Sequence, residues 1–160
     1  MSRSGYSDCL DNWAMIKWRG QVASAIRGKR GQAFLKELLA ALDAMPEKRL
    51  VSGEFEADGE VCTLGSVARV RGMALPKFDP DDTEGIGELF GIANQLVKEI
   101  MYENDEYSAW VVEAQRADRS AEGRWRYMRD WVAKQIAPES TSFEIAQNAL
   151  RQGAVTGEAT

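Results

Sequence analysis

The chain has 160 residues, of which 44% are hydrophobic and 9% aromatic, a composition typical of a folded globular protein. It contains no histidine, which excludes His-based catalytic triads and His metal sites. The formal net charge of −5 argues against bulk attraction to nucleic acid or to anionic lipid. Cys9 and Cys62 are too few for a disulfide framework or a four-cysteine zinc site.

The sequence contains no recognisable targeting signal. Its first ten residues, MSRSGYSDCL, have no apolar core of signal-peptide length. No stretch approaches the roughly 18 consecutive apolar residues of a membrane span. We therefore expect a cytoplasmic protein that does not associate with membranes.

Charge is distributed unevenly along the chain. Residues 1–50 carry nine Lys and Arg against five Asp and Glu, residues 51–115 four against fourteen, and residues 116–160 seven against six. The basic ends either neutralise the acidic middle within one fold, or the acidic middle forms a face for a basic partner. Ordinary solvent exposure is the simplest explanation of any charged run.

Two helices are predicted in the first third of the chain. Apolar residues at spacings of three and four predict one over Asp11 to Arg27, with Asp11 or Asn12 as its N-cap. A second, from Gln32 to Met45, has a broad apolar face and ends at Pro46.

The turn between these helices contains two glycines. Gly28 is expected to adopt the left-handed conformation that closes a helix, and Gly31 to open the next one. The two helices then form a helical hairpin.

After Arg49 the composition changes to short apolar runs around a turn signal, Asp58-Gly59. This pattern predicts a β-hairpin in which residues of about 49–56 pair with 60–62. An isolated hairpin is marginally stable in water, so it must pack on the helices. A short helix over Thr63 to Arg71 follows.

Further helical segments are predicted toward the C-terminus, at 84–90, Ile92 to Asn104, Tyr107 to Ala117 and Ala121 to Ile136. The fold class is therefore mainly α (α+β), a helical domain with one short β-hairpin packed on it. We expect a single domain over 1–138 with the hairpin at about 49–62. Residues 139–160 are expected to form a weakly helical or frayed tail.

Acidic residues around the predicted hairpin are the first candidates for a binding site. Glu54 and Glu56 share one face of a strand, and Asp58 and Glu60 continue the charge through the turn. Like charges this close repel unless a cation or a basic partner meets them. The row either engages the nucleic-acid groove of another protein or protects a sheet edge against aggregation.

A second acidic segment precedes the helix predicted at 84–90, where the backbone dipole favours negative charge. The spacing Asp79-x-Asp81-x-Thr83 resembles the start of a calcium loop, but the glycine and the bidentate glutamate that the loop needs are missing. Helix capping explains these residues, and partner binding is the alternative. The candidate residues are Asp79, Asp81, Asp82 and Glu84.

Two basic clusters support an alternative function, the binding of nucleic acid. Arg27, Lys29 and Arg30 gather at the turn between the first two helices, where capping of helix ends is the simpler explanation. On the last long helix arginines alternate with aromatic residues, a composition typical of binding hot spots when the aromatic rings are exposed. The candidates there are Arg124, Arg126, Tyr127 and Trp131.

Glu103-Asn104-Asp105-Glu106 is the densest carboxylate cluster on a predicted helix. Glu103 and Glu106 would share a face and could hold Mg²⁺, and they resemble the Glu-x-x-Glu half of the motif of all-α nucleoside triphosphate pyrophosphatases. The other half, Glu-x-x-Asp on a following helix, is missing, because Glu113 is followed at that spacing by Arg116 and Glu122 by Trp125. A solvated helix end is the simpler explanation. No activated nucleophile and no phosphate-binding loop is recognisable, so we expect a non-enzymatic protein with no metal and no cofactor.

Several segments resemble an uncharacterised family of small proteins encoded by bacteriophages and prophages. The resemblance covers about residues 2–136. It rests on the opening SRSGYSD, Trp18-Arg19-Gly20, the run from Arg27 to Pro46, Cys62-Thr63-Leu64-Gly65 and Glu103-Asn104-Asp105-Glu106. It implies a phage origin and expression in the cytoplasm of the bacterial host cell. The resemblance also favours a function as an inhibitor of host or defence machinery.

The leading hypothesis is a non-enzymatic, anti-CRISPR-like interaction protein. Its acidic residues would engage a basic surface of a host or defence protein, such as a nucleic-acid-handling complex. The alternatives are a nucleic-acid-binding accessory protein that uses the basic helix ends, and a small metal-dependent hydrolase at Glu103 and Glu106. A homodimer is also compatible with the sequence.

Overall fold

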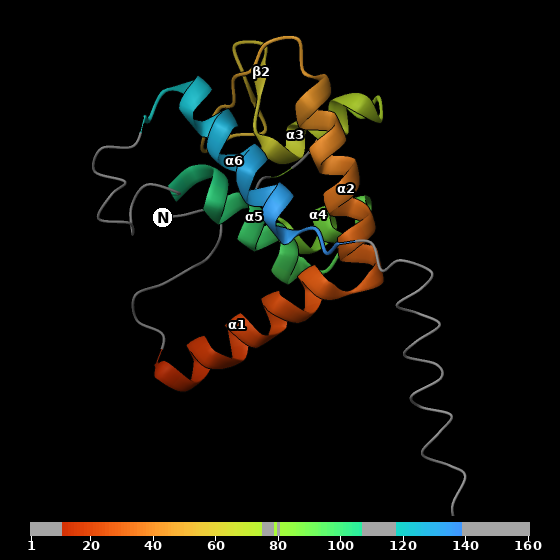
Figure 1. The fold of residues 1–160 in the computed structure, drawn as a ribbon, viewed down its shortest axis with the longest axis vertical. Coiled ribbons are helices and arrows are strands. Elements are labelled where there is room, and N and C mark those ends of the chain that lie inside the picture. Colours follow the sequence, from red (N-terminus) through yellow and green to blue (C-terminus); the bar gives the residue numbers. More distant parts are fainter. Residues whose placement is uncertain (1–10, 75–78, 80, 107–117, 139–160) are drawn as a thin grey trace, which may run out of the picture.

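The computed structural model describes residues 11–74, 79, 81–106 and 118–138, and it has the predicted fold class, mainly helical with one two-stranded antiparallel hairpin (Figure 1). The helices predicted over 107–117 and in the tail lie outside the described residues. In chain order the elements are α1 (Asn12–Arg27), α2 (Lys29–Ala44), β1 (Glu56–Ala57), β2 (Glu60–Val61), α3 (Thr63–Val70), α4 (Thr83–Phe90), α5 (Asn94–Glu106) and α6 (Ala121–Gln135).

Helices α1 and α2 meet at a corner that differs from the prediction. Gly28 is extended (φ −64°, ψ 153°) and not left-handed, and it caps the end of α1 and the start of α2 together. Helix α2 therefore begins at Lys29, three residues before the predicted start. Gly31 lies inside α2 and is buried against α1, where an added Cβ would stand 1.9 Å from the carbonyl oxygen of Ala25. The corner thus depends on the absence of a side chain at this position.

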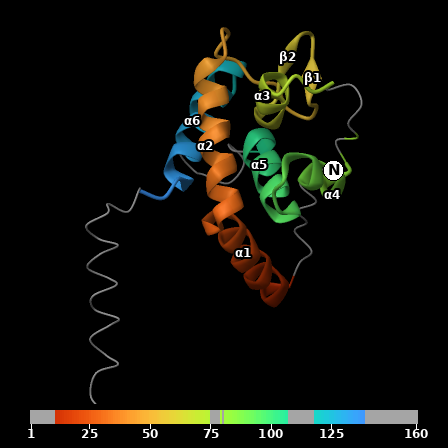
Figure 2. The same ribbon diagram turned by 90° about the vertical axis from the view of Figure 1, so that its right-hand side faces the viewer.

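One hydrophobic core joins the helices. Helix α2 packs against α1, α3 and α6, and α5 packs against α1, α3, α4 and α6. In Figure 2, α2 and α6 form one side of the molecule and the hairpin, α3 and α4 the other. The largest contributions to the core come from Phe34, Leu35, Leu38 and Leu42 of α2, from Leu96, Val97, Ile100 and Met101 of α5, and from Met128 and Val132 of α6.

The hairpin is shorter than predicted, with Glu56 opposite Val61 and Ala57 opposite Glu60. Its turn is the predicted one, because Asp58 (φ 51°) and Gly59 (φ 81°) both have the positive φ of a type I′ turn. Upstream of Glu56 the contacts to the second strand become irregular: the N–H of Val51 donates to the Val61 carbonyl at 3.1 Å and the N–H of Cys62 to the Phe55 carbonyl at 2.9 Å. Between them the N–H of Gly53 donates to Asp105 of α5.

Helix α3 lies directly against the hairpin. A Cβ on Gly65 would stand 2.6 Å from the carbonyl oxygen of Phe55 and 2.9 Å from Cβ of Val61. Phe55 and Val61 are buried in the core, so they fix the hairpin to the helices. The turn residues Asp58 and Gly59 are exposed. In the described part of the chain, none of the helices combines the length and the apolar character that crossing a membrane requires.

Candidate interaction surface

The four acidic residues of the hairpin divide into paired and unpaired carboxylates. Glu60 accepts a hydrogen bond from Nε of Arg49 at 2.6 Å, and Glu56 lies 3.8 Å from the Arg69 guanidinium. Glu54 and Asp58 are exposed and make no ion pair within the described ranges. The hairpin therefore presents two uncompensated negative charges on an element that is fixed in the core.

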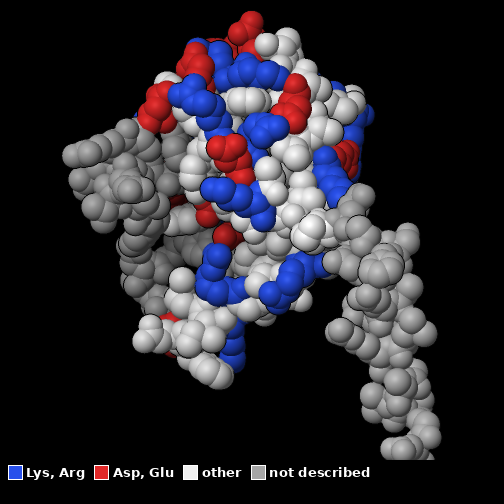
Figure 3. All heavy atoms as spheres, viewed as in Figure 1, with Lys and Arg blue, Asp and Glu red and all other residues white. Residues whose placement is uncertain are grey.

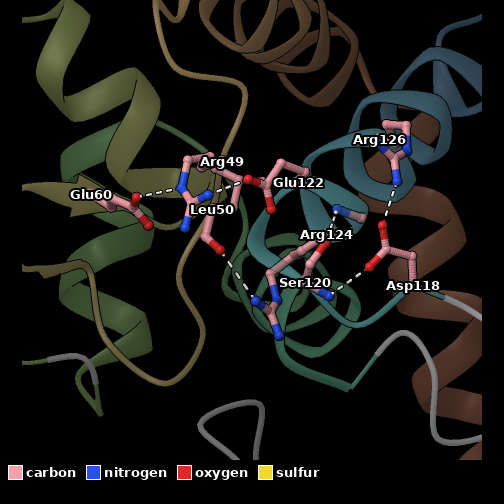
Figure 4. A network of polar contacts seen from close by, with 9 residues as sticks. Arg49, Leu50, Glu60, Asp118, Ser120, Glu122, Arg124 and Arg126 are labelled. Atoms are coloured by element: carbon pink, nitrogen blue, oxygen red, sulfur yellow. Dashed lines mark hydrogen bonds and ion pairs between the residues drawn. The ribbon is translucent and has the colours of Figure 1, made fainter.

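Arg49 connects the hairpin to α6. Its guanidinium lies between Glu60 and Glu122, which contacts it from the first turn of α6 (Figure 4). The hydrogen bond that Arg49 donates to Glu60 and the charge of Glu122 raise the pKa of Arg49 above its usual value. This arrangement is the internal neutralisation that the charge distribution suggested, but it involves one of the four hairpin carboxylates.

The second acidic segment caps a helix, as the sequence indicated. Asp82 is the N-cap of α4, and its carboxylate accepts from the N–H of Gly85 at 2.9 Å. Asp79 accepts from the N–H of Asp81 at 2.9 Å. Asp81 and Glu84 are exposed. Because α4 packs on α5 and the hairpin on α3, different elements position the two acidic segments.

The basic candidates on α6 are engaged within the molecule. Arg124 donates to the carbonyls of Asn104 at 2.9 Å and Leu50 at 3.2 Å, and Arg126 pairs with Asp118 at 2.5 Å (Figure 4). The Tyr127 hydroxyl donates to Glu103. Trp131 is half-buried against the core. The exposed aromatic anchor that the alternative function required is therefore absent from this helix.

The α1–α2 corner holds the remaining basic candidates. Arg27, Lys29 and Arg30 are exposed, and within the described ranges none of them forms an ion pair. Lys29 and Arg30 line an open groove of about 460 Å³, together with Gln21, Ser24 and Gln95. On the face in Figure 3, which presents α1, α2 and α6, Lys and Arg predominate among the charged side chains.

The carboxylate cluster at the end of α5 has a structural use. Asn104 is buried, accepts from the N–H and the hydroxyl of Thr63 at 3.1 and 2.7 Å, and donates to the Val51 carbonyl at 2.9 Å. Asp105 receives hydrogen bonds from Asn104 and from the N–H of Gly53. The two residues thus tie α5 to the chain that enters the hairpin.

Sequence reasoning missed a buried carboxylate, Glu99, one turn before Glu103 on α5. Glu99 is only 2% exposed, and Arg19 of α1 binds both of its carboxylate oxygens, at 2.9 and 2.8 Å. Burial raises the pKa of Glu103, and the negative charge of Glu99 adds to the effect, while the hydrogen bond from Tyr127 opposes it. Burial and the Glu103 carboxylate raise the pKa of Tyr127 as well. A charged residue between Val97 and Ile100, in the apolar stripe of the helix, was the available signal.

Within the ranges that the structure describes, no group of three or more His, Cys, Asp and Glu side chains could hold a metal ion. Cys62 is buried, and its Sγ accepts from the N–H of Gly65 at 3.4 Å at the start of α3. Glu103 is engaged by Tyr127 and lies beside Glu99.

Comparison with known proteins gives no relative. No protein-family model, no curated protein and no solved structure matches the chain.

Proposed function

We propose that the protein is a non-enzymatic inhibitor that binds a cationic surface of another protein through the acidic hairpin. The observation that carries the proposal is the pair of exposed carboxylates, Glu54 and Asp58, which have no ion-pair partner in the described part of the chain. Asp58 lies in the hairpin turn, and Glu54 lies next to Phe55, which is buried in the core. A rigid support lowers the entropic cost of binding, and an opposite charge supplies electrostatic complementarity and a fast association rate.

The resemblance to phage-encoded proteins indicates which cationic surfaces to test. Nucleic-acid-handling proteins of a bacterial host or of its defence systems carry grooves rich in Lys and Arg that bind phosphates. A carboxylate row that occupies such a groove excludes nucleic acid from it by direct competition. The proposal therefore predicts both binding and loss of the partner's nucleic-acid binding.

The test compares two charge reversals of equal size. Glu54→Lys with Asp58→Lys alters the hairpin, and Glu84→Lys with Glu88→Lys alters exposed positions on α4. Each tagged variant is used for affinity capture from nuclease-treated bacterial lysate, and captured proteins are assayed for nucleic-acid binding. We expect the wild type and the α4 variant to retain the same protein and to displace its nucleic acid, and the hairpin variant to lose both. Retention by the hairpin variant contradicts the proposal.

The second candidate is nucleic-acid binding at the α1–α2 corner, which is favoured by the groove beside Lys29 and Arg30. Omitting the nuclease from the same experiment tests it. Nucleic acid that is recovered with the wild type, and lost with Lys29→Glu and Arg30→Glu, would support the corner and count against the hairpin. Affinity there should fall steeply with salt, because counterions are released from the phosphates.

A further inference from the structure

A small apolar groove lies beside the acidic hairpin. It has a volume of about 150 Å³ and runs between the end of α2, the hairpin turn and α3. This is well below the roughly 300–1,000 Å³ of small-molecule sites, and about the size of a cavity that holds one benzene ring. Its dimensions fit a single apolar side chain. Its apolar walls come from Ala41, Ala44, Met45, Val61 and Val70.

Val70 makes the groove open to a partner. It stands in the last turn of α3 and is 64% exposed. Val61 on the opposite wall is fully buried. Because Val61 has no exposed surface, a side chain that enters the groove packs against Val70 at the surface and lies over the buried Val61.

The four charged residues that line the groove, Glu47, Arg49, Glu60 and Arg69, balance in charge, and the neighbouring carboxylates of Asp58 and Glu122 make its surroundings negative. Both arginines of the rim are engaged: Arg49 by Glu60 and Glu122, and Arg69 by the Gly59 carbonyl at 3.0 Å. Glu47, which lines the groove, is exposed and makes no ion pair within the described ranges, and the same is true of Asp58 beside the lining residue Gly59. The charge complementary to this rim is positive.

We propose that this groove receives one aliphatic or aromatic side chain from a protein segment in which Lys and Arg flank that side chain. The apolar residue packs against Val70 over the buried Val61, and the flanking cations face Glu47 and the hairpin carboxylates. The inference rests on the proposed function, because it specifies the part of the cationic partner that the acidic hairpin binds. A buried apolar anchor within a charged rim is the usual anatomy of a binding hot spot.

The test uses two labelled synthetic peptides rich in Lys and Arg, one with a single central Leu and one with Ser in its place. Fluorescence anisotropy gives the affinity of each for the intact protein. Wild type should bind the Leu peptide about tenfold or more tightly, since burying a Leu side chain is worth that much. Changes in the methyl NMR signals of Val61 and Val70 should appear with the Leu peptide and not with the Ser peptide.

Two variants remove the groove in different ways, and circular dichroism checks their folding. Ala44→Phe fills it from an exposed position at the end of α2, and Val70→Gln makes its mouth polar. Either should reduce the preference for Leu to nearly onefold. Leu89→Gln, at an exposed position on α4, is the matched control and should keep the full preference.

The outcomes separate this inference from the function on which it rests. If Glu54→Lys with Asp58→Lys weakens both peptides equally and wild type shows no preference for Leu, the acidic hairpin binds cations and the groove inference is wrong. If neither peptide depends on the hairpin carboxylates, the proposed function fails and the groove inference fails with it. A Leu preference that survives both Ala44→Phe and Val70→Gln also overturns the inference.

Discussion

Asn104 shows how one polar side chain can organise several segments. It has hydrogen-bond partners on both sides, the buried Thr63 at the start of α3 and the half-buried Val51 in the chain before the hairpin. A buried amide whose donors and acceptors are all hydrogen-bonded stabilises the fold. When the amide is removed, its buried partners lose their hydrogen bonds, and this destabilises the folded state. The sequence pattern identified Glu103 and Glu106 only as an incomplete Mg²⁺ motif and gave no signal for Asn104, because its neighbours Glu103, Asp105 and Glu106 are polar as well.

Replacing Asn104 by Ala should therefore destabilise the fold by about 2–4 kcal/mol, as several buried polar groups lose their partners at once. Urea denaturation followed by circular dichroism measures the change. Gln95→Ala, on the same helix at a half-buried position, should change the free energy of unfolding by no more than about 0.5 kcal/mol. Equal effects of the two substitutions would contradict this role of Asn104.

Glu103 gives the stability a pH dependence with a defined sign. Burial raises its pKa in the folded protein above the ordinary 4.5, so the folded state binds this proton more tightly than the unfolded chain. Its contribution is most favourable below pH 4.5 and is lost as the pH rises through the raised pKa. Glu103→Gln should be more stable than wild type at neutral pH, and the difference should shrink below pH 4.5.

Denaturant titrations of both proteins at several pH values test this prediction. The amide oxygen of Gln can still accept the Tyr127 hydrogen bond, so the comparison isolates the charge. Glu88→Gln, at an exposed position on α4, should show no such convergence with wild type. A stability difference between Glu103→Gln and wild type that stays constant with pH would mean that the Glu103 charge is not the cause.

The helices were predictable where an apolar stripe is followed by a residue that ends a helix. They were less predictable where two helices pack with their backbones in close contact. The stripe of α6 places Met128 and Val132 in the core as expected. The α1–α2 corner was misread, because glycine at a helix end usually adopts the left-handed conformation, whereas Gly31 is required by the close approach of Ala25. A sequence pattern does not distinguish a glycine that provides a positive φ from one that provides space.

Two glycines of this helix pair make a matched test. Gly31→Ala should destabilise the fold by about 1–3 kcal/mol or more, since the new Cβ collides with backbone that has no free space. Gly20→Ala, with nothing within 4 Å of the new Cβ, should stabilise α1 by about 0.5–1 kcal/mol through helix propensity. Thermal denaturation of both variants gives the two signs. A loss of stability in both would imply that Gly20 also has a close neighbour.

At the scale of the molecule, α2 and α6, from the two ends of the chain, lie on one side, and the hairpin, α3 and α4, from its acidic middle, lie on the other (Figure 2). Ion pairs join the first helices of the chain to its middle: Arg71 of α3 to Glu37 of α2, with both oxygens at 2.7 Å, and Arg19 of α1 to Glu99 of α5. The Arg71 hydrogen bonds lower the pKa of Glu37. The uneven distribution of charge was visible in the sequence. The carboxylates that take part in ion pairs could not be predicted from it, because the pairing depends on packing between helices that are distant in the chain.

Salt should therefore affect folding and binding differently. Raising the ionic strength from about 0.1 M to about 1 M shortens the screening length from about 10 Å to about 3 Å. An exposed pair such as Arg71 with Glu37 is worth about 0–1 kcal/mol, and the shared apolar core is insensitive to screening. We expect the urea midpoint to move little, while affinity for the Lys- and Arg-rich peptides falls at least about tenfold.

The preference for the Leu peptide over the Ser peptide should persist at high salt, because it arises from apolar burial and not from charge. Measuring both affinities at low and high salt thus resolves the two parts of the interface in one titration series. If the preference disappears together with the affinity, the Leu side chain does not enter a desolvated groove. If the affinity does not respond to salt, Glu54 and Asp58 are not the groups that attract the cations. The acidic residues of the hairpin would then serve only to protect the exposed sheet edge against aggregation.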